Sequence, residues 1–370
     1  MAASYWESTQ HKHWQFAKGE LAEMRQDLED EDPTLVQMFP LPSIRHLGIF
    51  FNQRSWKFIL PSANLAMYLR ANIPNPAEIN RLAKRMNIRQ QALATAQLYI
   101  KRFYTKVEIR RTNPYMIIAT ALYLACKMEE CPQHIRLLTN EAKGLWPSDF
   151  IGLDTSKVGE SEFFMISEMN SQLIVHQPYR TLTSLQAEFS LSSDELALAW
   201  SVVNDHYMTD LPLLYAPHIV ALTAILLALV LRPSNVPSAT GAGAAGNNGT
   251  AGVYQSSLAI ATSTLAQAQA RAALQGGHSS QGMAQQQNSG SQQTSQGSQG
   301  DGTPERRPQD ARVGKVTRFA HWLADSNINI EAMVDCAQEL ISCYECLEQY
   351  NDKITQEQIK RYIKARGLDK

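Results

Sequence analysis

The sequence predicts an all-α protein made of two tandem five-helix units, and three observations support that prediction. The stretch Asn113–Glu130 opens with Pro114, which suits a first helical position, and continues with residues that are apolar on almost every face. A displacement of the chain by 103 residues places a second apolar stretch, Pro217–Leu231, on the first. Apolar residues at helical spacing recur before and after both stretches. Each unit is therefore expected to surround a buried central helix.

The 103-residue register holds over two helices and the loop between them, which indicates an internal repeat. The second central helix is as apolar as a membrane span, but it is short and is bounded by His218 and Arg232, so we expect a core helix. The first copy carries Lys127 at its exit, where the second copy has Val230. The aligned residues are Leu93, Ala94, Ala96, Tyr104, Thr120, Ala121, Leu124 and Ala125 with Leu196, Ala197, Ala199, Tyr207, Thr223, Ala224, Leu227 and Ala228.

The first element expected along the chain is an amphipathic helix over residues 4–29. Ser4 and Glu7 have the spacing of a capping box, and Pro33 follows the end of the helix. This helix either packs on its own domain or docks on a partner, because it carries large aromatic residues. Further helices of the first unit are expected over Ile79–Asn87, Arg89–Lys106, Pro132–Trp146 and Glu160–Ile174.

Residues 233–311 interrupt the second unit. They consist mainly of Gly, Ser, Gln, Ala and Thr, a composition that buries too little apolar surface to offset the entropy of ordering. We therefore predict a long disordered insertion, in which only the run Ser256–Leu274 suits a short helix. Three helices are expected after it, over Val316–Ala324, Ile330–Gln349 and Gln356–Arg366.

Composition limits the class of protein. The chain has 370 residues and 44% hydrophobic content, enough for two domains, and its net charge of −1 argues against a general nucleic-acid or membrane footprint. Five cysteines at irregular spacing fit a reducing compartment. Cys343 and Cys346 lack a second pair at metal spacing, so core packing is the better interpretation. We find no catalytic triad, P-loop or zinc-hydrolase motif, and expect no enzymatic activity.

Three runs, Ile88–Ala96, Tyr99–Tyr104 and Tyr123–Glu130, resemble the cyclin box. Within the cyclin family the chain is most similar to the cyclin C branch, the cyclins of the Mediator kinase module. The resemblance covers residues 4–53, 78–232 and 312–352 and implies an N-terminal helix (1–33), two cyclin boxes (34–176 and 177–352) and a C-terminal tail helix (353–370). The runs that carry the branch assignment are Tyr5–Ser8, Trp14, Leu173–Arg180, Ala199–Asp205 and Thr209–Tyr215.

The resemblance implies a regulatory subunit that binds and activates the Mediator-associated cyclin-dependent kinase, beside other subunits of that module. It implies nuclear localisation and regulation of RNA polymerase II transcription, including phosphorylation of the polymerase C-terminal tail. Cyclins bind their kinase with a lysine and a glutamate that match Lys127 and Glu162, and we add Tyr5, Trp6 and Trp14 to the expected kinase-binding residues. No cofactor, metal, direct nucleic-acid contact, membrane attachment or obligate homo-oligomer is implied.

Three alternatives stay open at this point. Lys127 alone could simply complete a helix C-terminus. The kinase partner could be that of a general transcription factor or of elongation. A core like that of transcription factor IIB also has two such repeats, but its class carries an N-terminal zinc ribbon, and no cysteine precedes Cys126.

Two local features complete the predictions. Residues 54–77 separate Ile49 and Phe50 from Ile79 and Leu82, and their removal would join the flanks into one amphipathic helix. We interpret the segment as an insertion, either a retained intron in the gene prediction or a lineage-specific loop. The first unit is also locally basic, which we interpret as a solvated helix surface rather than a site for an acidic partner. The basic residues are Lys84, Arg85, Arg89, Lys101, Arg102, Lys106, Arg110 and Arg111.

Overall fold

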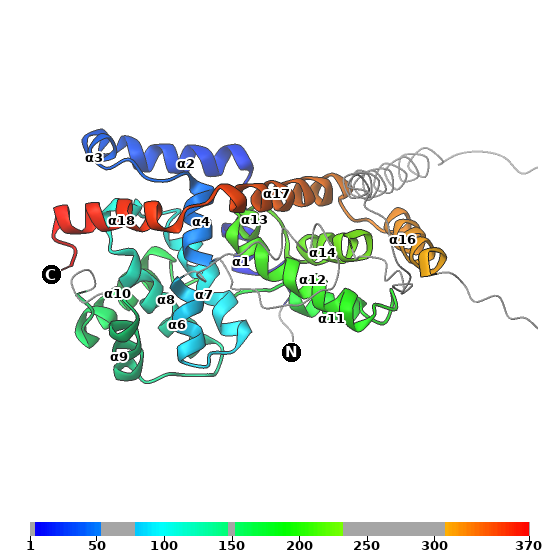
Figure 1. The fold of residues 1–370 in the computed structure, drawn as a ribbon, viewed down its shortest axis with the longest axis horizontal. Coiled ribbons are helices and arrows are strands. Elements are labelled where there is room, and N and C mark those ends of the chain that lie inside the picture. Colours follow the sequence, from blue (N-terminus) through cyan, green and yellow to red (C-terminus); the bar gives the residue numbers. More distant parts are fainter. Residues whose placement is uncertain (1–3, 53–77, 147–151, 232–307, 370) are drawn as a thin grey trace, which may run out of the picture.

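The structure, a computed structural model, describes residues 4–52, 78–146, 152–231 and 308–369. Every regular element in these ranges is a helix, which confirms the all-α prediction (Figure 1). The predicted loop 233–311 lies outside the described residues, apart from its last four residues, which begin α16. The helix suggested at Ser256–Leu274 and the segment 54–77 also lie outside them. Within the described ranges, no helix combines the length and hydropathy needed to cross a bilayer.

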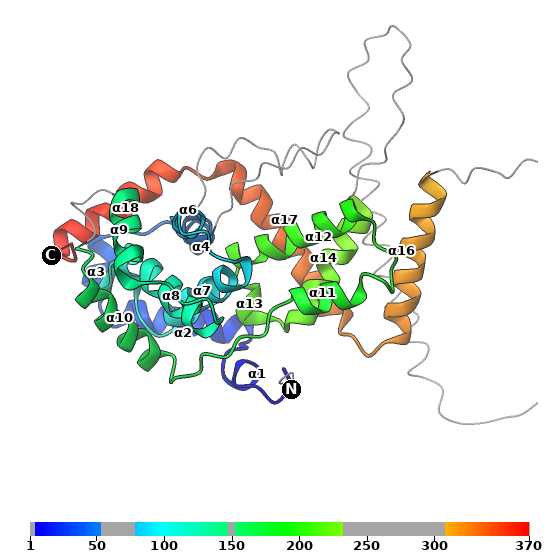
Figure 2. The same ribbon diagram turned by 90° about the horizontal axis from the view of Figure 1, so that it is seen from below.

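The first core is assembled around α8 (Pro114–Met128), as predicted. The side chain of Asn113 caps this helix by accepting from the backbone N–H of Tyr115 at 3.1 Å. Five further helices surround it and bury most of its length (Figures 1 and 2). They are α4 (Ile44–Asn52), α6 (Glu78–Arg85), α7 (Gln90–Phe103), α9 (Ile135–Leu145) and α10 (Thr155–Glu168).

The second core repeats this arrangement around α14 (Pro217–Leu231). The starts of α12 and α14 lie 103 residues after those of α7 and α8, so the internal repeat is confirmed in the fold. Residues Ile219–Val230 of α14 are all buried, which fits a core helix. The other elements of this core are α11 (Tyr179–Leu185), α12 (Ser193–Asp205), η3 (His206–Met208), α13 (Leu211–Leu214), α16 (Pro308–Asp325) and α17 (Ile330–Gln349).

Helices α4 and α6 lie end to end, although 25 residues outside the described ranges separate them in sequence (Figures 1 and 2). The side-chain amide of Asn80 in α6 donates to the carbonyl of Asn52, the last residue of α4, at 3.1 Å. This bond and a longer one from the Gln97 side-chain amide, at 3.5 Å, satisfy the buried carbonyl at the end of α4. At Gly48 of α4, an added Cβ would lie 2.0 Å from the Met208 carbonyl oxygen, so only glycine allows the first core to approach η3 this closely.

The prediction of one N-terminal helix over residues 4–29 is wrong. The segment forms α1 (Thr9–His13) and α2 (Lys18–Asp30), and Ser8 rather than Ser4 caps α1 by accepting from the His11 N–H. The break coincides with Trp14, whose ring is 2% exposed and whose indole N–H donates to the Gln172 side chain at 2.7 Å. Burial of this large ring in the first core diverts the chain. A further helix, α3 (Pro33–Met38), begins at the proline expected to end the segment.

Helix α10 begins and ends earlier than the predicted Glu160–Ile174. Asp154 caps its start, and Asn170 and Ser171 adopt left-handed backbone conformations with φ of 51° and 58° just after its end. The following residues leave the helix and form an extended connection to the second core. Tyr99 donates to the Leu173 carbonyl at 2.6 Å, which fixes this connection to α7.

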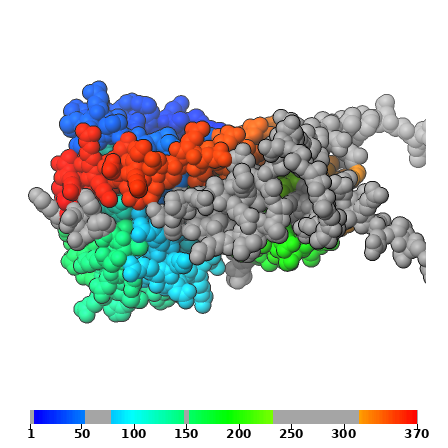
Figure 3. Space-filling model, in the orientation of Figure 1, coloured from blue at the N-terminus to red at the C-terminus, as the bar shows by residue number. Residues whose placement is uncertain are grey.

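The C-terminal helix α18 (Asp352–Arg366) packs on the first core rather than extending from the second. Ile359, Tyr362 and Ile363 are fully buried there, and the Asn113 side chain donates to the Leu368 carbonyl at 3.1 Å. Figure 3 shows the red C-terminal helix and the blue N-terminal helices on one face of the first core. Both ends of the chain therefore contribute to the stability of the first repeat.

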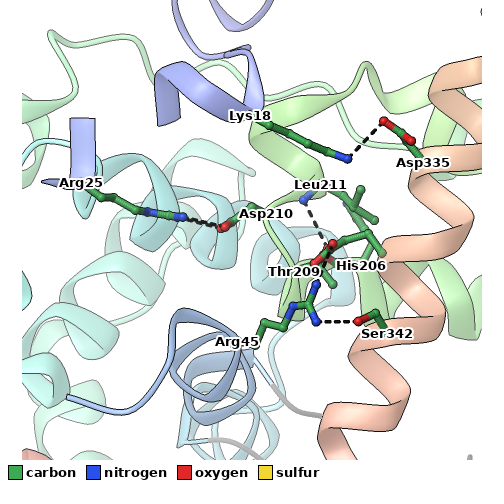
Figure 4. A network of polar contacts seen from close by, with 10 residues as sticks. Lys18, Arg25, Arg45, His206, Thr209, Asp210, Leu211, Asp335 and Ser342 are labelled. Atoms are coloured by element: carbon green, nitrogen blue, oxygen red, sulfur yellow. Dashed lines mark hydrogen bonds and ion pairs between the residues drawn. The ribbon is translucent and has the colours of Figure 1, made fainter. Parts of the chain in front are cut away.

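The predicted solvated basic surface is wrong for several of its members, because they are buried or paired. The side chain of Lys101 is only 8% exposed, and its ammonium lies 3.8 Å from Asp210. Arg25 of α2 contacts the same carboxylate with both guanidinium nitrogens, at 2.8 and 2.9 Å (Figure 4). Arg102 is fully buried and donates to the Gln172 carbonyl. Further ion pairs join Arg85 to Glu141, Arg110 to Glu108 and Glu29, and Arg111 to Glu31.

Candidate functional site

The exit of α8 presents a polar turn on a buried scaffold. Residues up to Cys126 are almost all buried, whereas Lys127 and Met128 are exposed. Glu130 has a φ of 53°, and the N–H of Cys131 donates to the carbonyl of Cys126 at 2.9 Å. This bond is the six-to-one bond of a Schellman motif, which ends the helix sharply. The backbone therefore fixes Lys127 in the last turn, where it meets solvent.

Lys127 forms an ion pair with Glu162 of α10, so the structure brings together the two residues that were predicted to bind a kinase. The ammonium nitrogen lies 2.7 and 2.8 Å from the two carboxylate oxygens. The side chain of Lys127 is 41% exposed and that of Glu162 is 11% exposed, so the glutamate is oriented from within the domain. Burial alone would lower the pKa of Lys127, but the hydrogen bond and negative charge of Glu162 outweigh it and raise that pKa. The lysine is held charged and in place.

Four residues outside the predicted site support this pair and the turn that carries it. The Lys127 ammonium lies 4.3 Å from the centre of the Tyr123 ring, one helical turn earlier. Glu129 accepts from the Thr95 hydroxyl at 2.6 Å, and Gln177 also donates to that hydroxyl oxygen at 2.6 Å. The four-residue spacing of Tyr123 and Lys127 signals a shared helix face. No local pattern signals the other contacts, which join α8 to α7 and to the connection between the repeats.

Exposed apolar side chains occur on the helices that carry the ion pair and on the neighbouring α9. Phe163 follows Glu162 in α10 and is 75% exposed, the largest value among the large apolar residues that are described as exposed. Met128 follows Lys127, and Leu137 lies on α9, which packs on both α8 and α10. Exposed apolar residues gathered around a polar pair are typical of a protein–protein interface.

The predicted N-terminal residues divide into two kinds. Trp6 is 60% exposed and lies against His218 with its ring centre 5.5 Å away, so it is available at the surface. Tyr5 is half-buried and donates to the Gln15 side chain at 2.5 Å. Trp14 is buried under the Arg102 guanidinium and cannot reach a partner, so its assignment as a binding residue is corrected to that of an internal anchor.

Metal-binding chemistry finds no support among the described residues, where no cluster of three or more His, Cys, Asp or Glu side chains could hold an ion. Cys336 and Cys343 are buried in α17, in agreement with core packing. The site at the exit of α8 therefore offers an ion pair and apolar surface. These features suit docking.

Comparison with known proteins places the chain in a family. Residues 77–174, which include both Lys127 and Glu162, match the family described as "Cyclin, N-terminal domain". Curated proteins named "RNA polymerase II holoenzyme cyclin-like subunit" are 59% identical in both Chaetomium globosum and Neurospora crassa, over the full length of each chain. The chain belongs to this cyclin-like family. A solved structure from Chaetomium thermophilum, titled a CAK complex bound to ATP-gamma-S, contains a chain with the same fold at a TM-score of 0.52. Its identity is 17%, and the match covers 98% of this chain and 90% of that one.

The family match covers residues 77–174, which belong to the first repeat. In this cyclin-like chain the equivalent of Lys127 in the second repeat is Val230, which is 1% exposed. The second repeat thus retains the buried helix but has an apolar, buried side chain at the position equivalent to Lys127. The ion pair and its apolar surroundings belong to the first repeat.

Proposed function

We propose that this chain is a cyclin of the cyclin C type, the regulatory subunit that binds and activates the kinase of the Mediator kinase module. The observation that supports the proposal best is the Lys127–Glu162 pair, preformed at the exit of α8 and bordered by exposed Phe163 and Met128. The names of its relatives connect such chains with RNA polymerase II, in agreement with a nuclear role in transcription.

The mechanism follows from the donors and acceptors left over in the pair. An ammonium has three N–H donors, and the Glu162 carboxylate accepts from the Lys127 ammonium through both oxygens. One N–H therefore remains for a backbone carbonyl at the C-terminal end of a partner helix. The carboxylate likewise keeps lone pairs for backbone N–H groups. A kinase helix seated on these groups and on Phe163 is held in the position that aligns the catalytic lysine–glutamate pair of the kinase.

The second candidate is a cyclin of another transcriptional kinase, in a general transcription factor or in elongation. The same docking geometry would serve it, so the two candidates differ in partner and not in mechanism. The full-length identity to the holoenzyme cyclin-like subunits favours the first candidate.

An activation assay tests the proposal. The full chain is added to the purified Mediator-associated kinase with a peptide of the polymerase C-terminal tail as substrate. We expect phosphorylation to rise strongly with the wild type and with Lys84→Glu, an exposed control on α6, and to stay near the kinase-alone rate with Glu162→Lys. Equal activation by Glu162→Lys and the wild type would contradict the docking site. Activation of a different transcriptional kinase instead would support the second candidate.

A further inference from the structure

Two thiols bracket the turn that carries Lys127. Cys126 is the last fully buried residue of α8, and Cys131 follows five positions later at the surface. The Schellman motif described above places these two residues at the positions whose side chains normally touch. Here both positions are cysteine, and the Cys131 thiol lies close enough to Cys126 to contribute, after burial, to the raised pKa of the Cys126 thiol. Both cysteines are free in this structure.

We propose that Cys126 and Cys131 form a reversible disulfide when the protein meets a hydroperoxide. The partly exposed Cys131 thiol attacks the peroxide, which breaks the O–O bond and leaves a sulfenic acid on Cys131 and an alcohol or water. The sulfur of Cys126 then attacks the sulfenic sulfur. A new S–S bond forms, the S–O bond breaks, and the proton of Cys126 leaves with the hydroxide as water. The two thiols together lose two electrons, which the hydroperoxide gains.

The division of roles follows from burial. Burial raises the pKa of the Cys126 thiol to about 12, so this group is a poor first target for an oxidant. Cys131 has solvent access, and the backbone bond from its N–H to the Cys126 carbonyl holds the two cysteines at a high effective concentration, which favours bridging over further oxidation to sulfinic acid.

The chain contains an internal comparison for this chemistry. Cys343 and Cys346 lie three residues apart inside α17, and Cys346 is partly exposed like Cys131. Residues at this spacing on a regular helix hold their Cβ atoms about 5–6 Å apart, beyond the roughly 3.5–4.5 Å that a disulfide requires. The helical pair should therefore stay unbridged under conditions that bridge Cys126 and Cys131.

A disulfide at this turn should weaken kinase binding, a consequence that rests on the proposed function. Cys126 is fixed in the packed core, so Cys131 must move toward it when the sulfurs approach bonding distance. Glu129, between them, is hydrogen-bonded to Thr95 and resists this movement. The resulting distortion falls on the turn that includes Lys127 and Met128, and oxidation should weaken kinase binding.

Peptide mapping tests the bridge directly on the full chain. The protein is treated with hydrogen peroxide, free thiols are alkylated, and the unfolded protein is digested with trypsin. Cleavage after Lys127 makes the bridge join two separate peptides, residues 112–127 and 128–136. We expect this linked pair in the wild type, its loss with dithiothreitol, and its absence in Cys131→Ser. Thermal unfolding should show that Cys131→Ser is folded, because its side chain is only partly buried.

The possible results test separately whether the disulfide forms and whether it weakens kinase binding. Oxidation of Cys131 to sulfinic or sulfonic acid without the linked peptides, or equal bridging of Cys343 and Cys346, would overturn the proposal. Kinase binding is measured in parallel for peroxide-treated wild type and Cys131→Ser. Weaker binding of the wild type alone, restored by dithiothreitol, supports the consequence. Unchanged binding despite the linked peptides refutes that consequence and leaves the bridge standing. Failure of the proposed function itself would show separately, as unchanged binding of reduced Lys127→Glu.

Discussion

Reversal and exchange of the charges at Lys127 and Glu162 distinguish a docking role from a structural one. Lys127→Glu places a second carboxylate beside Glu162, and the double variant Lys127→Glu with Glu162→Lys restores an ion pair with its polarity inverted. If the pair only stabilises the fold, the exchange should restore wild-type behaviour. If a partner helix binds only when position 127 is positive and position 162 is negative, the exchange should restore stability but leave binding weak.

The structure sets the expected magnitudes. The Lys127 side chain is 41% exposed, so solvent screens the ion pair and limits its contribution to folding to about 0.5–1 kcal/mol, the upper part of the range for exposed pairs. At a close interface, a reversed charge is expected to weaken binding by about 2–5 kcal/mol, roughly a 30- to 5,000-fold rise in Kd. Binding should therefore respond far more strongly than stability.

Two measurements decide the matter, both with Lys84→Glu as the matched control. Urea unfolding reports the free energy of unfolding, and titration calorimetry with the purified kinase reports Kd. We expect Lys127→Glu to unfold at slightly lower urea and to bind very weakly, and the exchanged pair to recover the unfolding midpoint alone. Recovery of wild-type affinity by the exchanged pair would refute the reasoning, because the partner would then be indifferent to polarity.

Three further predictions concern stability, each measured by urea unfolding. Burial lowers the pKa of His206 to about 3 from 6.5, so the unfolded chain takes up a proton that the folded chain refuses. Stability should be complete above pH 6.5 and fall toward pH 3 by up to about 1.4 kcal/mol per unit, and a slope unchanged in His206→Asn would exclude this group as its source. Asp210→Asn leaves the ammonium of Lys101 beside a neutral amide and should lower the free energy of unfolding by about 2–4 kcal/mol. The cost is smaller than for a wholly buried pair because Asp210 is partly exposed. A loss within experimental error would show that the Lys101–Asp210 pair does not stabilise the fold. The buried hydroxyl of Tyr362 has no hydrogen-bond partner among the described residues. Tyr362→Phe should therefore keep or raise the free energy of unfolding, whereas Tyr362→Ala should lower it by about 3–5 kcal/mol. A large loss in Tyr362→Phe would reveal a partner for the hydroxyl.

The two central helices and their register could be predicted from the sequence because each is specified locally. Asn113 and Pro114 fix the start of α8, and the continuous apolar composition fixes its burial, so the predicted and observed bounds agree closely. The same holds for α14, whose bounds follow from the repeat. The sequence also placed Lys127 correctly at the exit, because the change of polarity there is abrupt.

The remaining features depend on contacts between distant segments, which local patterns do not encode. Trp14 interrupts the N-terminal helix because its ring is bound by Gln172, and that contact spans 158 positions in sequence. The basic residues of the first repeat were predicted to be solvated, yet Lys101 is paired with Asp210 of the second repeat. The polar sequence of α18 gives little indication that Tyr362 completes the first core. In each case tertiary packing decides against local propensity.

The most direct test of the central claim is an affinity purification of the tagged full chain from its own cells, with wild type, Lys127→Glu and Lys84→Glu compared by quantitative mass spectrometry. We expect a cyclin-dependent kinase and other subunits of the Mediator kinase module to accompany the wild type and Lys84→Glu, and the kinase to be lost from Lys127→Glu. Recovery of the kinase at wild-type level with Lys127→Glu, or of no kinase with any of the three, would contradict this expectation.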